Sequence, residues 1–188
     1  GWMNLEKWAD KERIAELKAL ADEIRADADV LVLVGVGGSN QAARAVIEAL
    51  KAAKPGCEII YAGNNLSAHY YLNVLEKIKD KSVYINVIAK NFETLEPGLG
   101  FRLFIDFLNN KYGTGAGKRV IATGTKGSSF HKIAIEEGYH FLAFPDDIGG
   151  RFSVFSDVGL FPMLVAGFAA QRVANGAYEI AAALYGDS

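Results

Sequence analysis

The loop at residues 35–39 (GVGGS) has the composition of an anion-binding turn. It follows the apolar run 30–34 (VLVLV) and precedes the helix-forming segment 41–54 (QAARAVIEALKAAK). Glycines let the chain turn sharply and let a ligand approach the main chain. A helix that follows adds roughly half a positive charge at its N-terminus, where backbone amides are unpaired. This loop therefore favours a ligand that carries a phosphate.

Two other interpretations of this loop remain open. A dinucleotide fingerprint (GxGxxG) would need a glycine at position 40, which is Asn40. It would also need an acidic residue at the end of the next predicted strand, where Tyr61-Ala62-Gly63 stands. A tight turn with a purely structural role would use the same glycines.

A second loop, 89–97 (AKNFETLEP), leaves the third predicted strand and enters a helix. Lys90 could neutralise an anion there. Thr94 could bind phosphate or cap the helix, and capping is the more common role for a threonine in this position. Glu93 argues against a phosphate deep in this loop, because like charges repel strongly when they are partly desolvated.

A third loop, 145–153 (PDDIGGRFS), combines two carboxylates, a glycine pair and Arg151. The glycines would let the guanidinium reach a ligand through a sharp bend. The alternative is an Arg151–Asp147 salt bridge within the loop. A fourth segment, 124–129 (GTKGSS), lacks the spacing of a nucleotide-binding P-loop, so we expect Ser128 or Ser129 to cap a helix.

The remaining reactive side chains form no recognisable catalytic or metal site. His69, His131 and His140 have no ligand spacing with one another, with the single cysteine or with carboxylates. The sequence contains no GxSxG motif and no nucleophile with an obvious base, which argues against a hydrolase. We therefore expect neither a metal nor a cofactor.

The composition fits one globular domain with a sizeable core. The 188 residues are 51% hydrophobic and carry a formal net charge of −2, so nothing favours nucleic acid or an anionic membrane as a partner. The one cysteine, Cys57, excludes an internal disulfide and fits a reducing compartment. No apolar stretch reaches the roughly 18–20 residues of a membrane span, and the first residues do not resemble a secretory signal. We expect a cytoplasmic protein.

Apolar runs alternate with helix-forming segments along the chain. The predicted strands are 30–34, 58–61, 83–88, 119–122 and 140–144. The predicted helices are 10–25, capped by Asp10, then about 40–53, 66–79, 94–112 and 127–137, with closing helices in 152–184 that break at Gly167 or Asn175-Gly176. This alternation predicts an α/β fold with a doubly wound parallel sheet, in which ligands sit beyond the carboxyl ends of the strands.

Several of these segments together resemble glucose-6-phosphate isomerases of the bacterial type. They are the 35–39 loop, the Lys90 loop ending at Glu96, the segment 61–67 (YAGNNLS) and the run 138–153 (GYHFLAFPDDIGGRFS). The resemblance spans nearly the whole chain, and its GGR[F/Y]S segment is highly specific. It implies a three-layer α/β/α sandwich with a five-stranded sheet, a sugar-isomerase (SIS) domain at 29–188. A helical segment, 1–28, would pack on this domain, and the family's second SIS domain would lie outside this chain.

The resemblance also implies a reaction and roles for individual residues. Gly38 and Ser39 would contact the sugar or its phosphate. Arg151, next to Gly150, would stabilise the enediolate charge. The phosphate-loop positions correspond to Lys90, Asn91 and Thr94. The family interconverts glucose 6-phosphate and fructose 6-phosphate with a glutamate that moves a proton between C1 and C2, without metal or cofactor. The implied partner is a phosphorylated hexose, and the full-length protein would be a homodimer.

The sequence departs from the family pattern at several positions. Ala89, Asn91 and Glu93 stand where the family phosphate loop has hydroxyl side chains, and each lost donor to a charged ligand costs on the order of 1.5–3 kcal/mol. Asp157 replaces a small residue and adds an acid near the site. No residue matches the family's glutamate base, ring-opening histidine or lysine. We expect an N-terminal fragment of an isomerase that is inactive alone. The alternative is a non-catalytic sugar-phosphate-binding module with an altered phosphate loop.

Overall fold

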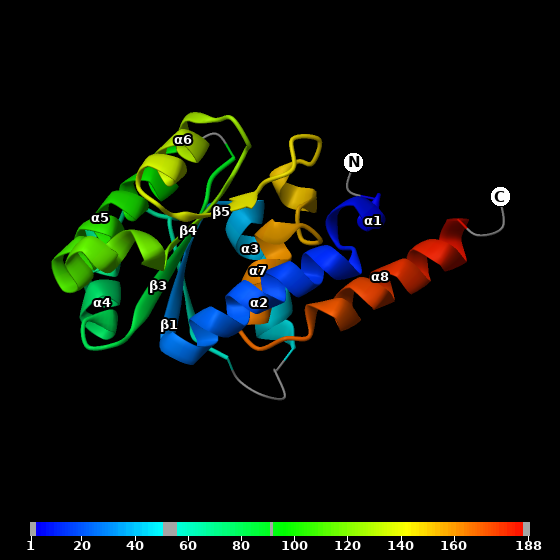
Figure 1. Cartoon of the computed structure of the whole chain (residues 1–188), viewed down its shortest axis with the longest axis horizontal. Coiled ribbons are helices and arrows are strands. Elements are labelled where there is room, and N and C mark those ends of the chain that lie inside the picture. Colours follow the sequence, from blue (N-terminus) through cyan, green and yellow to red (C-terminus); the bar gives the residue numbers. More distant parts are fainter. Residues whose placement is uncertain (1–2, 51–55, 91, 186–188) are drawn as a thin grey trace.

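Five parallel strands form the central sheet (Figure 1). The computed structural model describes residues 3–50, 56–90 and 92–185. The strands are β1 (Val30–Val34), β2 (Glu58–Ala62), β3 (Val83–Ile88), β4 (Val120–Gly124) and β5 (His140–Ala143). Their order is β2-β1-β3-β4-β5, and each neighbouring pair is parallel. The five-stranded, doubly wound parallel sheet expected from the sequence is confirmed.

Helices cover both faces of the sheet (Figure 1). One layer contains α4 (Ala68–Ile78), α5 (Leu95–Tyr112) and α6 (Ser129–Glu136). The other contains α2 (Lys11–Asp27), α3 (Gly38–Ala49), α7 (Asp157–Val165) and α8 (Ala170–Tyr185). Val30 and Val32 of β1 pack toward the first layer, and Leu31 and Leu33 pack toward the second. Because both faces are buried, β1 is a continuous apolar run and not an alternating one.

Helix α2 begins where the sequence predicts. The Asp10 carboxylate accepts the backbone amide of Arg13 at 2.9 Å, which confirms Asp10 as the N-cap. The buried face of α2 joins the same core cluster as Leu31; its members are Ile14, Leu17, Ala21 and Ile24. Helix α1 (Leu5–Trp8) falls within the segment 1–28 expected to be helical, whereas the 3-10 helices η1 (Gly113–Arg119) and η2 (Gly150–Phe152) were not predicted.

The closing helices confirm one predicted break and correct the other. Gly167, with a φ of 94°, lies between α7, which is buried along its whole length, and α8. Asn175-Gly176 does not interrupt α8. There the Gln171 side-chain amide donates to the Asn175 side chain at 2.9 Å, and Ala174 packs in the core. These contacts outweigh the roughly 1 kcal/mol that a glycine costs inside a helix. Across the described chain, no helix combines the length and apolar character that crossing a bilayer requires.

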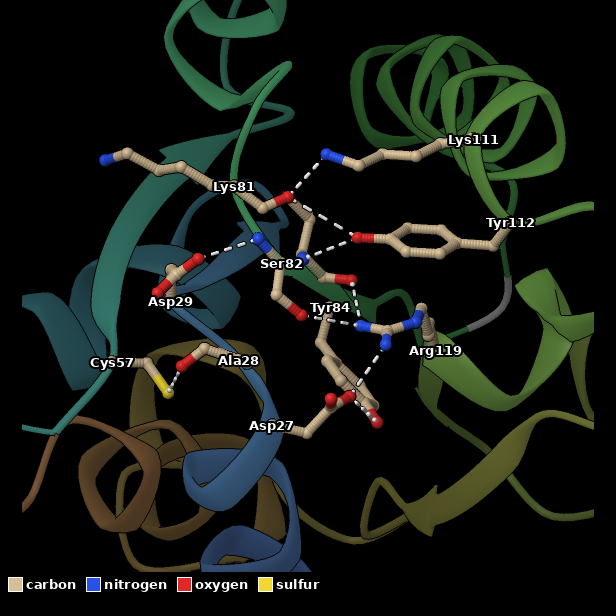
Figure 2. Close-up of polar contacts among 11 residues, drawn as sticks. Asp27, Ala28, Asp29, Cys57, Lys81, Ser82, Tyr84, Lys111, Tyr112 and Arg119 are labelled. Atoms are coloured by element: carbon tan, nitrogen blue, oxygen red, sulfur yellow. Dashed lines mark hydrogen bonds and ion pairs between the residues drawn. The ribbon is translucent and has the colours of Figure 1, made fainter.

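A polar network fixes the amino ends of the strands, at the edge opposite the carboxyl ends (Figure 2). The Arg119 guanidinium donates to the Ser82 hydroxyl at 3.1 Å and to the Asp27 carboxylate at 2.7 Å. It also lies 4.7 Å from the ring centroid of Tyr84 and 4.1 Å from that of Tyr112. Arg119 thereby connects the end of α2 to the starts of β3 and β4.

Candidate functional site

The order of the strands reverses between β1 and β3, and the loops after these strands frame the candidate site. From β1 the chain crosses to β2 on one side, whereas from β3 it crosses to β4 on the other. In open parallel sheets, ligands bind beyond the carboxyl ends at such a reversal, because the diverging helices leave a crevice there. The loops 35–39 and 89–94 both leave the sheet at this point.

Helix α3 begins at this crevice with unpaired backbone donors. Gly37 precedes it with a φ of 61°, a left-handed conformation that glycine adopts readily. Within the described chain, the amides of Gly38 and Ser39 donate to no carbonyl, and the first turn carries no acidic residue. Asn40 is fully buried, and its side-chain amide holds the turn by donating to the Gly35 carbonyl at 3.3 Å. The start of α3 therefore has the geometry of an anion site.

The 145–153 loop meets this helix backbone to backbone. A Cβ built on Gly38 would lie 1.8 Å from the Gly150 oxygen and 2.7 Å from the Arg151 nitrogen. Only glycine fits at position 38, because any side chain would push the two main chains apart. The structure thus brings together Gly38, Gly150 and Arg151, three of the residues singled out in the sequence.

Arg151 does not form the salt bridge considered as its alternative role. The Asp147 carboxylate pairs with Lys7 at 3.3 Å. Arg151 is exposed and makes no hydrogen bond or ion pair with any residue of the described ranges. Its guanidinium stands on the loop that touches Gly38, with its donors in solvent.

The second loop contributes Lys90 and Thr94 in different ways. The Lys90 ammonium donates to the backbone carbonyls of Asp146 at 2.9 Å and Ile148 at 3.2 Å. Thr94 is exposed and occupies the N-cap position of α5, but its hydroxyl accepts no capping bond, contrary to the expected role. Asn91 lies outside the described residues.

The backbone of this loop is held in an unusual conformation by an aromatic anchor. Phe92 has a φ of 58°, in the left-handed region that side chains other than glycine rarely adopt. Its ring stacks on Phe130 at a centroid distance of 4.5 Å and meets Phe101 edge-on at 5.8 Å. Strain of about 1–3 kcal/mol is typical of such positions, and ring burial offsets it here. Glu93, the next residue, is exposed.

The sequence suggested that Asp157 adds an acid to the site, but the structure places its carboxylate elsewhere. Its side chain is only 6% exposed, and both carboxylate oxygens accept bonds from the Arg13 guanidinium. One of these oxygens also accepts the Ala143 amide at 3.1 Å. The hydrogen bonds to Asp157 raise the pKa of Arg13 above its ordinary value. The charge at Asp157 is therefore neutralised between α2 and α7.

The 124–129 segment caps a helix, as predicted. The Ser128 hydroxyl accepts the His131 amide at 3.2 Å, and the His131 ring accepts the Gly127 amide at 3.0 Å. In the part of the chain that the structure describes, no three His, Cys, Asp or Glu side chains gather into a group that could hold a metal.

Sequence reasoning missed several long-range contacts of this region. Lys90 reaches carbonyls 56 and 58 positions away, and Arg13 reaches Asp157 across 144 positions. Neither pair left a signal in local spacing, because each depends on which elements the fold places side by side.

Comparisons with known proteins identify the family of this chain. The profile of the family described as Phosphoglucose isomerase matches residues 11–184. The chain belongs to the phosphoglucose isomerase family. Glucose-6-phosphate isomerase of Acetivibrio thermocellus is 43% identical over 95% of this chain and 42% of its own length. The enzyme of that name from Fusobacterium nucleatum is 41% identical over 94% of this chain and 42% of its own length. The chain thus spans about two fifths of the length of these relatives.

Two solved structures share the fold of this phosphoglucose isomerase family member. A hypothetical protein from Thermus thermophilus superposes with a TM-score of 0.90 at 26% identity, over 98% of this chain and 43% of that one. A glucose-6-phosphate isomerase from Chlamydia trachomatis superposes with a TM-score of 0.80 at 27% identity, over 92% of this chain and 33% of that one.

Proposed function

We propose that this chain is the N-terminal part of a glucose-6-phosphate isomerase and supplies the phosphate-binding half of its active site. The reaction interconverts glucose 6-phosphate and fructose 6-phosphate, with a proton leaving C2 of the open-chain aldose and arriving at C1 of the ketose. The observation that carries the proposal is the contact between the start of α3 and the Gly150–Arg151 backbone at the strand-order reversal. The 41–43% identity to glucose-6-phosphate isomerases supports the choice of reaction.

The phosphate of the sugar would bind where backbone donors are unpaired. The amides of Gly38 and Ser39 face no competing acid in the first turn of α3, and the helix dipole favours a dianion there. The second loop would add the side-chain amide of Asn91 and the hydroxyl of Thr94, which makes no capping hydrogen bond. Lys90 lies in the same loop, but its side-chain ammonium donates to the carbonyls of Asp146 and Ile148.

Arg151 would act on the reacting carbons. A guanidinium fixed over them stabilises the negative charge of the enediolate, and Gly150 lets its main chain approach the ligand without a side chain between them. A preorganised donor of this kind is worth roughly 10²–10³ in kcat. The proton itself would be carried by a glutamate of the second SIS domain, which the family resemblance assigns to a part outside this chain. The chain alone would then bind the sugar without isomerising it.

The full-length protein would act in the cytoplasm as a homodimer, with a phosphorylated hexose as its partner. A single cysteine, Cys57, is typical of proteins from a reducing compartment, which fits this location.

Calorimetry on the chain as it stands tests the proposal. Fructose 6-phosphate should bind and unphosphorylated fructose should not, because the anion supplies the recognition. Ser39→Ala should bind fructose 6-phosphate as the parent does if the backbone amide is the donor. Equal heats for the two sugars, or none for either, would contradict the proposal. In the full-length protein, Arg151→Ala should lower kcat by roughly 10² or more.

A second candidate is a sugar-phosphate-binding module without catalysis. The observations that favour it are the exposed carboxylate of Glu93 beside the start of α5 and the buried methyl group of Ala89, where the family has hydroxyl donors. Turnover decides between the two. Full-length protein that binds fructose 6-phosphate but shows no isomerisation would favour the regulatory module.

A further inference from the structure

The side chain of Lys90 connects two loops of the candidate site. Its ammonium donates to the carbonyls of Asp146 at 2.9 Å and Ile148 at 3.2 Å. The ammonium also lies 5.6 Å from the centroid of the Phe144 ring, which is 3% exposed. Lys90 is thus half-buried and spans the base of the loop that begins at Pro145.

The carbonyls bonded to Lys90 belong to Asp146 and Ile148, four and two positions before Gly150, which meets α3. Ile148 has a side chain that is 3% exposed, and Gly149 links it to η2, which begins at Gly150. The Gly150 oxygen is the atom that a Cβ on Gly38 would approach to 1.8 Å. A displacement of the Ile148 carbonyl would therefore move the main chain that carries Arg151.

We infer that Lys90 is a positioning residue for Arg151, and that its ammonium holds the guanidinium loop against the start of α3 and does not bind the sugar phosphate. The inference rests on the proposed function only in naming Arg151 as the group to be positioned. An ammonium has three donors, and the loop carbonyls already use two of them.

Binding of a phosphate by the Lys90 ammonium would weaken its hold on the Arg151 loop. If the ammonium turned away from the loop toward a phosphate, the Asp146 and Ile148 carbonyls would lose their charged donor, and bonds to a charged donor are roughly twice as strong as neutral ones. The loop that presents Arg151 would then be released at the moment the ligand binds. Positioning by Lys90 avoids this conflict, because the ammonium keeps its two acceptors in the free and the bound protein.

A measurement without any substitution tests the contact directly. In the unaltered chain, the Lys90 ammonium should give a nitrogen–proton NMR signal that is protected from exchange with water and coupled to the Asp146 and Ile148 carbonyls. Lys126 also follows a strand and is exposed, and its ammonium has no hydrogen-bond partner within the described ranges. It is the internal control and should exchange rapidly. Equal exchange at the two lysines would overturn the inference, as would loss of the Lys90 couplings when fructose 6-phosphate is added.

Substitution then tests the consequence for the loop. The Phe152 amide donates to the Gly149 carbonyl at 2.9 Å and reports on the turn that carries Arg151. Its hydrogen exchange should be roughly ten-fold faster in Lys90→Met, restored in Lys90→Arg and unchanged in Lys126→Met. The Leu17 amide, in the middle of α2, should keep its rate in all three. An unchanged Phe152 rate in Lys90→Met, or an equal acceleration at Leu17, would overturn the inference.

Kinetics of the full-length protein separate positioning from phosphate binding. Lys90→Met should lower kcat roughly ten-fold with little change in KM, because Arg151 acts on the transition state. A rise in KM at constant kcat would identify Lys90 as a phosphate ligand and overturn the inference. If fructose 6-phosphate does not bind at all while the Phe152 result holds, the proposed function fails and the contact of Lys90 with the loop stands.

Discussion

The backbone oxygen of Gly150 lies so close to Gly38 that a Cβ on Gly38 would be 1.8 Å from it. This contact joins the start of α3 to the loop of Arg151, and it requires glycine for reasons of space. Gly38→Ala should push the two main chains apart and destabilise the protein by about 1–3 kcal/mol, as overpacking does elsewhere. It should also weaken binding of fructose 6-phosphate, because the backbone amides of Gly38 and Ser39 would be displaced relative to the Arg151 loop. Urea denaturation and calorimetry measure the two effects.

Gly176→Ala is the matched control for this substitution. Gly176 lies inside α8, and a Cβ there would meet nothing within 4 Å. The change should raise the free energy of unfolding by roughly 0.5–1 kcal/mol, since alanine is the better helix former. A Gly38→Ala protein as stable and as competent in binding as Gly176→Ala would show that the two loops can separate without cost.

The ion pair of Arg13 with Asp157 should be important for stability. The Asp157 side chain is 6% exposed in the intact protein, and Arg13→Met would leave it with only the Ala143 amide as a partner. Breaking a buried pair in this way costs about 3–5 kcal/mol, and partial exposure of Arg13 favours the lower end. Lys18→Met on the same helix removes an exposed pair with Asp22 and should cost less than about 0.5 kcal/mol. Similar losses in the two variants, measured by urea denaturation, would disprove the importance of the buried pair.

The sequence predicts the sheet well because local composition determines it. The run 30–34 is apolar at every position, since β1 is buried on both faces, and the alternation with helices implies parallel pairing. Parallel pairing in turn places the 35–39 and 89–94 loops at one edge. The sequence predicted the ends of the helices and strands less accurately. Asn175-Gly176 looked like a break, but tertiary packing of α8 overrides its local preference.

The internal contacts of the site could not be predicted from the sequence. Asp157 is six positions from Arg151, and this proximity suggested a shared site. The first turn of α7 instead directs the Asp157 carboxylate to α2. Lys90 follows a strand, where a cation commonly neutralises an anion, and nothing in the sequence indicated its bonds to carbonyls of a distant loop. Such contacts depend on how the fold places distant loops and helices next to one another, which the local sequence pattern does not specify.

Two tyrosines should make the stability of the protein fall in alkali. Burial, reinforced by Glu48, raises the pKa of Tyr61 to about 12, and burial reinforced by Glu137 raises that of Tyr139 to about 12. A folded-state pKa above the unfolded value near 10 stabilises the protein below pH 10. This stabilisation should be lost as the pH rises from about 10 to about 12. Denaturation series across this window, with phenolate absorbance as the titration signal, measure it.

Tyr61→Phe separates this effect from the deprotonation of lysines over the same pH range. The Tyr61 hydroxyl is buried and has no hydrogen-bond partner among the described residues. Its removal should raise stability at pH 7 by roughly 1 kcal/mol and should flatten the alkaline decline relative to the parent. The same decline in both proteins would mean that Tyr61 ionises as freely in the folded chain as in the unfolded one.

The exposed carboxylate of Glu93 should weaken phosphate binding from its place beside the start of α5. Glu93 directly precedes Thr94, the N-cap residue of α5. A sugar phosphate bound at that helix start would therefore be repelled by the Glu93 carboxylate, and the solvent would screen this repulsion only in part. Glu93→Gln should tighten the Kd for fructose 6-phosphate roughly 2- to 5-fold at low salt, and the gain should shrink as ionic strength rises. Glu136→Gln, an exposed carboxylate at the end of α6, is the control and should leave the Kd unchanged. If the two variants bind alike at low salt, the phosphate does not reach the α5 start, and the amides of Gly38 and Ser39 remain as its binding groups.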